Sequence, residues 1–234
     1  MGLPLYLAVT PGEIQEIPVF PEHFAWMGCE FSPFSTGISN IPNTLPPDSM
    51  VILTDRLPCT GHSPGVVADQ LEEAVQCLHC SRVLLDFQRP PDPESRAMVR
   101  TILDTLPCPV GVPPAYEADG PVLLPPCPLN QPLEEFLHPW NKREIWMEAG
   151  LCQQIYTVSS AGSAHSSQIP PLPLDGGQYD PDLCCQYHTR IFPDRIEFIL
   201  SDTLNTLPLK LEKAGKLGVA LAVGMARELK IRPR

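Results

Sequence analysis

The stretch EFILSDTLNTLPLKLEKAGKLGVALAVG, residues 197–224, combines apolar runs with a predicted helix. An apolar run leads into a segment with helical spacing, and a second apolar run follows. The helix predicted over residues 201–214 has Asp202 near its start and Lys210 near its end, as the helix dipole favours. Pro208 costs this helix a hydrogen bond unless the helix begins late. Short apolar runs recur along the chain with helical patterns between several of them, and this is typical of a parallel sheet with crossover helices.

Eight short apolar runs are candidate strands of such a sheet. They cover residues 3–10, 24–31, 50–56, 82–88, 109–114, 121–126, 144–150 and 217–224. Helical spacing of apolar residues predicts two further helices, over residues 65–79 and 93–106. Other connections, such as residues 115–120, are too short for a crossover helix. We therefore expect some helices to be missing.

Proline makes up 30 of the 234 residues, which indicates a folded chain rich in loops. Residues 159–184 are rich in Ser, Pro and Gly and are predicted to form an extended surface loop. The segment after it is predicted to be a β-hairpin with its turn at residues 192–194. Because no linker separates two independently patterned halves, we expect one domain over residues 1–234. Residues 151–200 would be an excursion from it.

The charge and the cysteines exclude several classes of function. The 27 acidic residues against 16 basic ones give a net charge of −11, which disfavours binding to nucleic acid or to an anionic membrane surface. Nine scattered cysteines favour reduced thiols, and neither a signal sequence nor an apolar stretch of about 20 residues is seen. A bacterial-type cytoplasm is the expected location. The histidine and cysteine spacing predicts no metal site, no cofactor is indicated, and the oligomeric state stays open.

Two stretches resemble the family 18 glycoside hydrolases, which are chitinase-like TIM barrels. Residues 197–224 are similar to the closing unit of that family, and SRVLLDFQ, residues 81–88, falls where the family carries its DGxDxDxE strand. This resemblance implies a reduced (β/α)8 TIM barrel. Some of its helices would be missing, and a β-hairpin or loop insertion would precede the last strand.

The family motif is largely lost in this sequence. Its defined positions fall on Ser81, Arg82, Leu84, Asp86 and Gln88. Only Asp86 keeps the family residue type, and Gln88 stands at the position of the catalytic acid. The Tyr-Asp pair of the sixth strand has no counterpart, and the Trp of the last strand falls on Ala222. Because an amide cannot protonate a leaving group, the resemblance implies a degenerate enzyme, or pseudoenzyme.

The main functional hypothesis is a non-catalytic barrel that binds a carbohydrate or a protein. An oligosaccharide or a peptide would bind at the barrel mouth, where barrel proteins place their sites. The candidate ligand-binding residues are Asp86, Gln88, Tyr116, Trp146 and Trp26. Two plainer interpretations remain open at this point. Asp86 and Gln88 could instead bond to each other, and the rings could be packed in the core.

The alternative is an active hydrolase of glycosidic bonds that uses relocated carboxylates. The candidates, near the C-terminal ends of predicted strands, are Glu30, Asp55, Asp86 and Glu148. A glycosidase needs two carboxyl groups roughly 5 to 10 Å apart across an open cleft. For Asp55 a rim salt bridge with Arg56 is the plainer interpretation.

Overall fold

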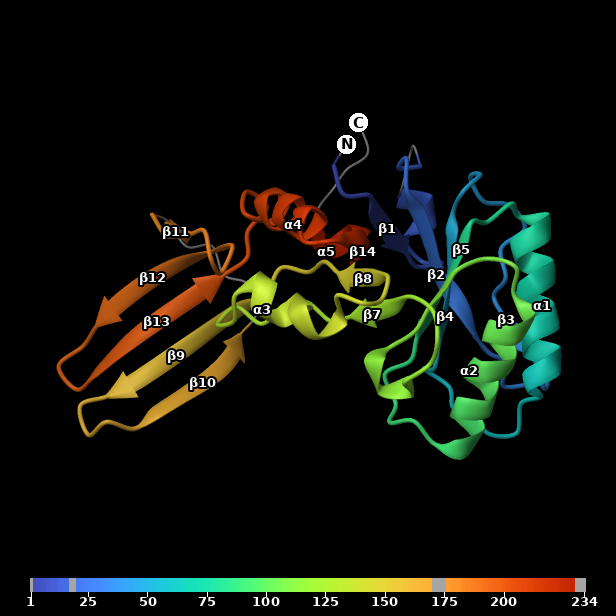
Figure 1. The fold of residues 1–234 in the computed structure, drawn as a ribbon, viewed down its shortest axis with the longest axis horizontal. Helices are drawn as coiled ribbons and strands as arrows, with labels where there is room; N and C mark the ends of the chain where they lie inside the picture. Colours follow the sequence, from blue (N-terminus) through green and yellow to red (C-terminus); the bar gives the residue numbers. More distant parts are fainter. Residues whose placement is uncertain (1, 17–19, 170–175, 230–234) are drawn as a thin grey trace.

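The computed structural model describes residues 2–16, 20–169 and 176–229, and parallel strands form most of its larger sheet (Figure 1). Each of the eight predicted runs overlaps one strand of a parallel sheet. In chain order these are β1 (Leu5–Val9), β2 (Phe24–Phe31), β4 (Met50–Thr54), β5 (Arg82–Asp86), β6 (Val110–Gly111), β7 (Val122–Leu124), β8 (Ile145–Glu148) and β14 (Val219–Met225). The short strand β3 (Ile38–Ser39) pairs antiparallel with β2.

The parallel strands are joined in the order β6-β5-β4-β2-β1-β14-β8-β7. The two ends of this path meet at a parallel bridge between Val112 and Val122. At the bridge Val112 N donates to the Pro121 carbonyl oxygen at 3.1 Å, and Leu123 N donates to the Val112 carbonyl oxygen at 2.9 Å. The sheet is therefore a nearly closed eight-stranded barrel, which confirms the reduced (β/α)8 fold.

Helices cover only part of the barrel. The predicted helices after β4 and β5 are confirmed as α1 (Pro64–Cys77) and α2 (Pro93–Thr105). Between β6 and β7 the described residues contain only the 3-10 turn η2 (Pro114–Tyr116), and the helix after β7 is the short α3 (Leu133–Leu137), followed by the turn η3 (His138–Trp140). The turn η1 (Ile14–Glu16) follows β1.

The last crossover helix differs from the prediction. Helix α4 spans Leu207–Lys216 rather than residues 201–214. Pro208 lies in its first turn, where a missing backbone N–H costs no helical hydrogen bond. The late start of the helix therefore accommodates this proline. The four-residue helix α5 (Ala226–Leu229) follows β14. No helix in the described ranges is both long enough and apolar enough to span a membrane.

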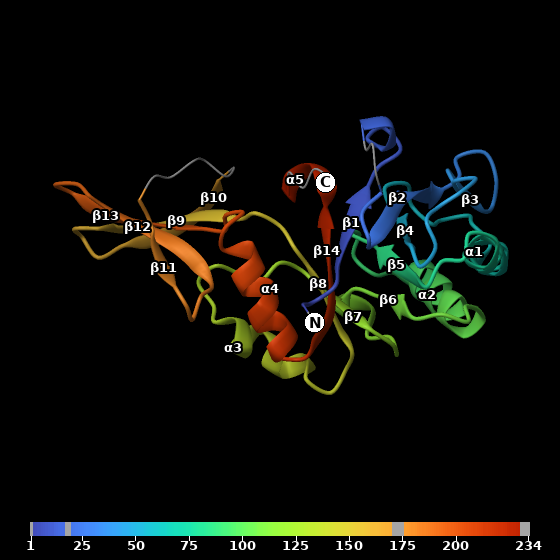
Figure 2. The ribbon, with the colours of Figure 1, turned by 90° about the horizontal axis from the view of Figure 1, so that it is seen from above.

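The insertion before the last barrel strand is larger than the expected hairpin. It is a five-stranded antiparallel sheet in the order β10-β9-β13-β12-β11. The hairpin of β12 (Cys185–Ile191) and β13 (Arg195–Ser201) is confirmed, and β9 (Gln153–Ser159) pairs with β13. Figure 2 shows this sheet to one side of the barrel, with α4 and α3 between them.

The predicted surface loop over residues 159–184 is wrong in part. It contains β10 (Ala164–Ile169) and β11 (Gln178–Asp180), while residues 170–175 lie outside the described residues. Strand β10 reads AHSSQI and lies at the edge of the sheet with nearly all of its residues exposed. An edge strand without a buried face carries no apolar alternation, so the sequence pattern does not reveal it.

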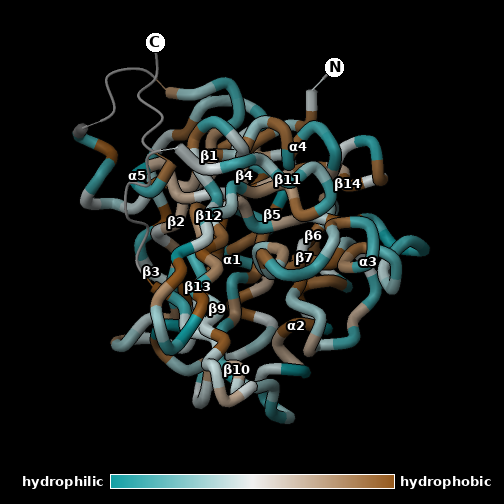
Figure 3. Tube along the Cα trace, turned by 90° about the vertical axis from the view of Figure 1, so that its left-hand side faces the viewer, coloured by the Kyte–Doolittle hydropathy of each residue, from teal (hydrophilic) through white to brown (hydrophobic). Residues whose placement is uncertain are grey.

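The core is divided by the barrel wall. Inward-facing side chains such as Tyr6, Met50, Leu84 and Trp146 fill the barrel, and separate clusters lie between its outer surface and the helices. Figure 3 shows hydrophobic residues gathered in the middle of the molecule and hydrophilic ones in the outer turns. The filling stops short of one end, where the strands' carboxyl ends surround a cavity.

Candidate functional site

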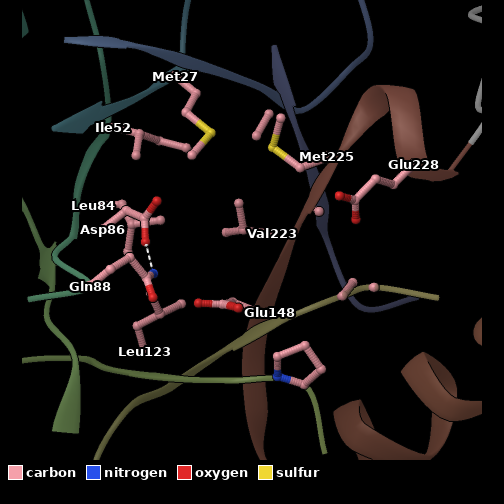
Figure 4. Close-up of a pocket in the computed structure, with 15 residues that line it drawn as sticks. Met27, Ile52, Leu84, Asp86, Gln88, Leu123, Glu148, Val223, Met225 and Glu228 are labelled. Atoms are coloured by element: carbon pink, nitrogen blue, oxygen red, sulfur yellow. Dashed lines mark hydrogen bonds between the residues drawn. The ribbon is translucent and has the colours of Figure 1, made fainter. Parts of the chain in front are cut away.

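A cavity of about 210 Å³ lies at the mouth formed by the C-terminal ends of the barrel strands. Its walls are mostly apolar, and Ile52, Leu84, Leu123 and Val223 contribute from four different strands. Its polar lining consists of Asp86, Gln88, Glu148 and Glu228 (Figure 4). TIM-barrel enzymes build their active sites at this end, so this cavity is the candidate site.

Asp86 and Gln88 lie together on one side of the cavity. Leu84, Asp86 and Gln88 alternate along β5 and its extension, so all three face inward. Gln88 Nε2 donates a hydrogen bond to Asp86 Oδ1. Burial raises the pKa of the Asp86 carboxyl, and the hydrogen bond from Gln88 works against that rise. Asp86 therefore already has one partner, and the amide of Gln88 has used one of its donors.

Glu148 faces the same cavity from the end of β8. Its pKa is raised to about 7, first by burial, then by the charge of Asp86 and then by that of Glu228. In Figure 4 the carboxylate of Glu148 points toward the side chain of Gln88, and Glu228 points in from the opposite side. Glu148 is thus a carboxyl group that can hold a proton near neutral pH.

Glu228 is a site residue that the sequence reasoning missed. It belongs to α5, directly after β14. The strand β14 was predicted, and residues just beyond a barrel strand lie on the rim, so this placement was the available signal.

Asp55 does not line the cavity, and the interpretation as a salt bridge with Arg56 is wrong. Its buried carboxylate accepts hydrogen bonds from the backbone N–H groups of Gln88 and Arg89, both at 2.8 Å. Arg89 Nε in turn donates to the Asp55 carbonyl oxygen at 2.9 Å. Asp55 is therefore a positioning residue that fixes the chain immediately after β5, including Gln88.

Glu30 and Trp26 also lie outside the cavity lining. Glu30 accepts a hydrogen bond from Asn40 Nδ2 at 2.9 Å, and Trp26 Nε1 donates to the Asn40 carbonyl oxygen at 3.0 Å. On β2 the inward positions are Ala25 and Met27, so the ring of Trp26 points out of the barrel and packs against the outer cluster.

Trp146 and Tyr116 are core rings. Trp146 shares the inward face of β8 with Glu148 but lies deeper, with 0% exposure, and its Nε1 donates to Glu144 Oε1 at 2.7 Å. Tyr116 lies on η2 and packs edge-on against Phe87, with ring centroids 5.8 Å apart. Neither ring lines the cavity, so its described lining offers no aromatic surface.

Ala222, the position matched to the family's last-strand Trp, faces the wrong way for a floor residue. It packs outside the barrel against Leu211 and Ala214 of α4. The inward positions of β14 are Leu221, Val223 and Met225, and the last two line the cavity. Because side chains alternate along β14, aliphatic residues and a methionine point into the barrel, and Ala222 does not.

The described residues contain no group of three or more His, Cys, Asp or Glu side chains arranged to hold a metal ion. The arrangement that remains is an apolar cavity with three carboxyl groups and one amide. Two of these carboxyls, Asp86 and Glu148, interact electrostatically and have raised pKa values.

Replacing Glu148 tests the electrostatics of the cavity. Because the folded-state pKa of about 7 lies above the ordinary 4.5, ionisation of Glu148 costs stability as pH rises between these values. Glu148→Gln is expected to match the wild type below about pH 4.5 and to be more stable by roughly 2 kcal/mol above about pH 7.5. Melting temperatures of both proteins across this range measure it. Parallel curves would contradict it, and Glu30→Gln removes a carboxylate outside the cavity as a control.

The chain is a TIM barrel with a cavity at its mouth, and its fold is similar to that of solved chitinases. The similar solved structures include a family 18 chitinase double mutant from Cycas revoluta in complex with (GlcNAc)4, at 10% identity and TM-score 0.55, covering 94% of each chain. A class V chitinase from Nicotiana tobaccum matches at 8% identity and TM-score 0.54, over 96% of this chain and 93% of that one.

The spore cortex-lytic enzyme SleL of Bacillus megaterium matches at 10% identity and TM-score 0.51, over 95% of this chain and 70% of that chain. At these identities the likeness extends to the fold. The sequence matches no protein-family model. It also matches no curated protein.

Proposed function

We propose that the chain is a catalytically degenerate, glycoside-hydrolase-like protein that binds a carbohydrate at the mouth of its barrel without cleaving it. The observation that carries this proposal is Gln88. It faces the mouth cavity at the motif position of the catalytic acid, where a carboxamide can bond to a sugar but cannot donate a proton to a leaving group.

Two solved structures support binding without cleavage. The Cycas revoluta and Nicotiana tobaccum chitinases were each crystallised with a bound tetrasaccharide, (GlcNAc)4 and NAG4, and each carried a glutamate-to-glutamine substitution. A barrel of this fold therefore retains an oligosaccharide after such an exchange. The cavity of about 210 Å³ is smaller than the roughly 300–1,000 Å³ of typical ligand sites, so it suits one sugar residue of a chain.

The test compares binding and cleavage on chitooligosaccharides. We expect the wild type to gain thermal stability with these sugars and to release no shorter products. Gln88→Glu, which keeps Asp86 in place, is expected to raise cleavage above the wild type, within the roughly 10²–10⁴-fold that a general acid contributes. Chromatography of the products measures cleavage. A wild type that binds no sugar in the same thermal screen would contradict the proposal.

A second candidate is an active hydrolase that uses Asp86 and Glu148. The observation in its favour is the pKa of about 7 at Glu148, which would let this residue act as the acid while Asp86 acts as the base or nucleophile. Glu30 and Asp55 line no part of the cavity and have no place in this mechanism. Cleavage by the wild type that Glu148→Gln abolishes would decide for it.

A further inference from the structure

The charged side chains among the described lining of the mouth cavity are all acidic. Asp86, Glu148 and Glu228 reach it from β5, β8 and α5, and no Lys, Arg or His is among the described residues that line it. Arg56 acts on Asp86 from outside this lining. No hydrogen bond or ion pair within the described chain engages the carboxylates of Glu148 and Glu228. Among the described residues, the cavity therefore has no cation of its own.

A half-buried carboxylate without a partner, such as that of Glu148, is costly between apolar walls, and a ligand changes that cost according to its own charge. A neutral N-acetyl group would displace water from the carboxylates and give them no counter-charge. An ammonium group supplies both a positive charge and three hydrogen-bond donors. The aliphatic walls formed by Ile52, Leu84 and Val223 suit the C–H face of a sugar ring.

We infer that the cavity selects a hexosamine residue with a free ammonium group over the N-acetylated residue, and that the ammonium lies between Asp86 and Glu148. This inference rests on the proposed carbohydrate-binding function and specifies its ligand class. The three carboxylates come from separate elements around one cavity, and Glu148 interacts electrostatically with both of the others. The apolar walls and the volume of the cavity limit the bound group to about one ring.

Binding of such a cation must also move a proton. Glu148 has a pKa of about 7, so it is mostly protonated at pH 6.5. A positive charge beside it stabilises the ionised form, while Asp86 and Glu228, which also face it, oppose ionisation. Binding of the ammonium sugar at pH 6.5 is therefore expected to release a substantial fraction of one proton. Binding of the N-acetylated sugar releases none from this group.

The experiment is calorimetry at pH 6.5 with the disaccharides of glucosamine and of N-acetylglucosamine, each in two buffers that differ in ionisation enthalpy. For the wild type we expect at least a tenfold preference for the glucosamine disaccharide and a buffer-dependent heat. Glu148→Gln is expected to reduce the preference to about threefold or less and to abolish the proton release. Glu30→Gln removes the same charge outside the cavity and is expected to behave as the wild type.

The other outcomes separate this inference from the function on which it rests. Equal binding of both disaccharides by the wild type overturns the ammonium preference and leaves carbohydrate binding standing. A preference that survives in Glu148→Gln also overturns it, because the cation then lies elsewhere. Failure of the wild type to bind either disaccharide, while it melts cooperatively, overturns both.

Discussion

Lys210→Met is expected to lower the free energy of unfolding by about 3–5 kcal/mol. Lys210 Nζ donates to Asp202 Oδ1 at 2.6 Å, and the two side chains are only 6% and 1% exposed. Removal of the lysine leaves a carboxylate buried without its counter-charge. Urea unfolding at neutral pH measures the loss.

The pH dependence of this variant has a definite sign. Burial raises the pKa of the Asp202 carboxyl, and the charge and hydrogen bond of Lys210 oppose that rise. Without Lys210 the folded state favours the protonated acid, so the deficit is expected to be small at acid pH and to grow as pH rises through the raised pKa. A deficit that is constant with pH would show that lost packing, rather than the unpaired charge, dominates.

The same helix offers a matched control. Lys216→Met also removes a lysine from α4, but Lys216 pairs with Glu212 at the surface, where the two side chains are 71% and 61% exposed. Exposed pairs of this spacing contribute about 0.3–0.5 kcal/mol, so this change is expected to be nearly neutral. Equal losses for the two variants would contradict the assignment of the buried pair.

Asp55→Ala is expected to cost about 2–4 kcal/mol and to weaken sugar binding at the mouth as well. The substitution leaves the backbone N–H groups of Gln88 and Arg89 without the carboxylate that accepts both of them. Because these bonds fix the chain after β5, the side chain of Gln88 would lose its fixed position beside Asp86. Urea unfolding and calorimetry with chitooligosaccharides measure the two effects.

A useful control for this variant is Asp69→Ala, which truncates an exposed acidic residue on α1. Surface changes of this kind fall within about 0.5 kcal/mol, so Asp69→Ala is expected to leave both stability and binding unchanged. A stable Asp55→Ala protein with wild-type affinity would show that the residue neither supports the fold nor positions Gln88.

The barrel was predictable because each of its strands is buried on both faces. Such strands appear in the sequence as short continuous apolar runs, and all eight were identified. Pro208 also indicated that α4 begins late. The five-stranded insertion was not, because the pairing of polar strands such as β10 depends on neighbours distant in sequence.

The candidate site was predictable in part, because the sequence alone does not always show which side chains of a strand point into the barrel. Asp86, Gln88 and Glu148 were placed correctly at the rim because alternation along β5 and β8 points them inward. Trp26 and Ala222 have the opposite parity on their strands, which only the barrel's register reveals. The backbone role of Asp55 depends on a contact between two neighbouring strand ends, and no spacing in the sequence indicates it.

We expect the junction of Val112 with Val122 to make one side of the barrel more compliant than the rest. It holds two short strands together through a pair of backbone hydrogen bonds, and no crossover helix braces it from outside within the described residues. Leu123 in this seam is also part of the cavity wall. A guest bulkier than the resting cavity would therefore gain room by pushing β7 outward, while the arc from β5 to β8 would keep Asp86 and Glu148 in place.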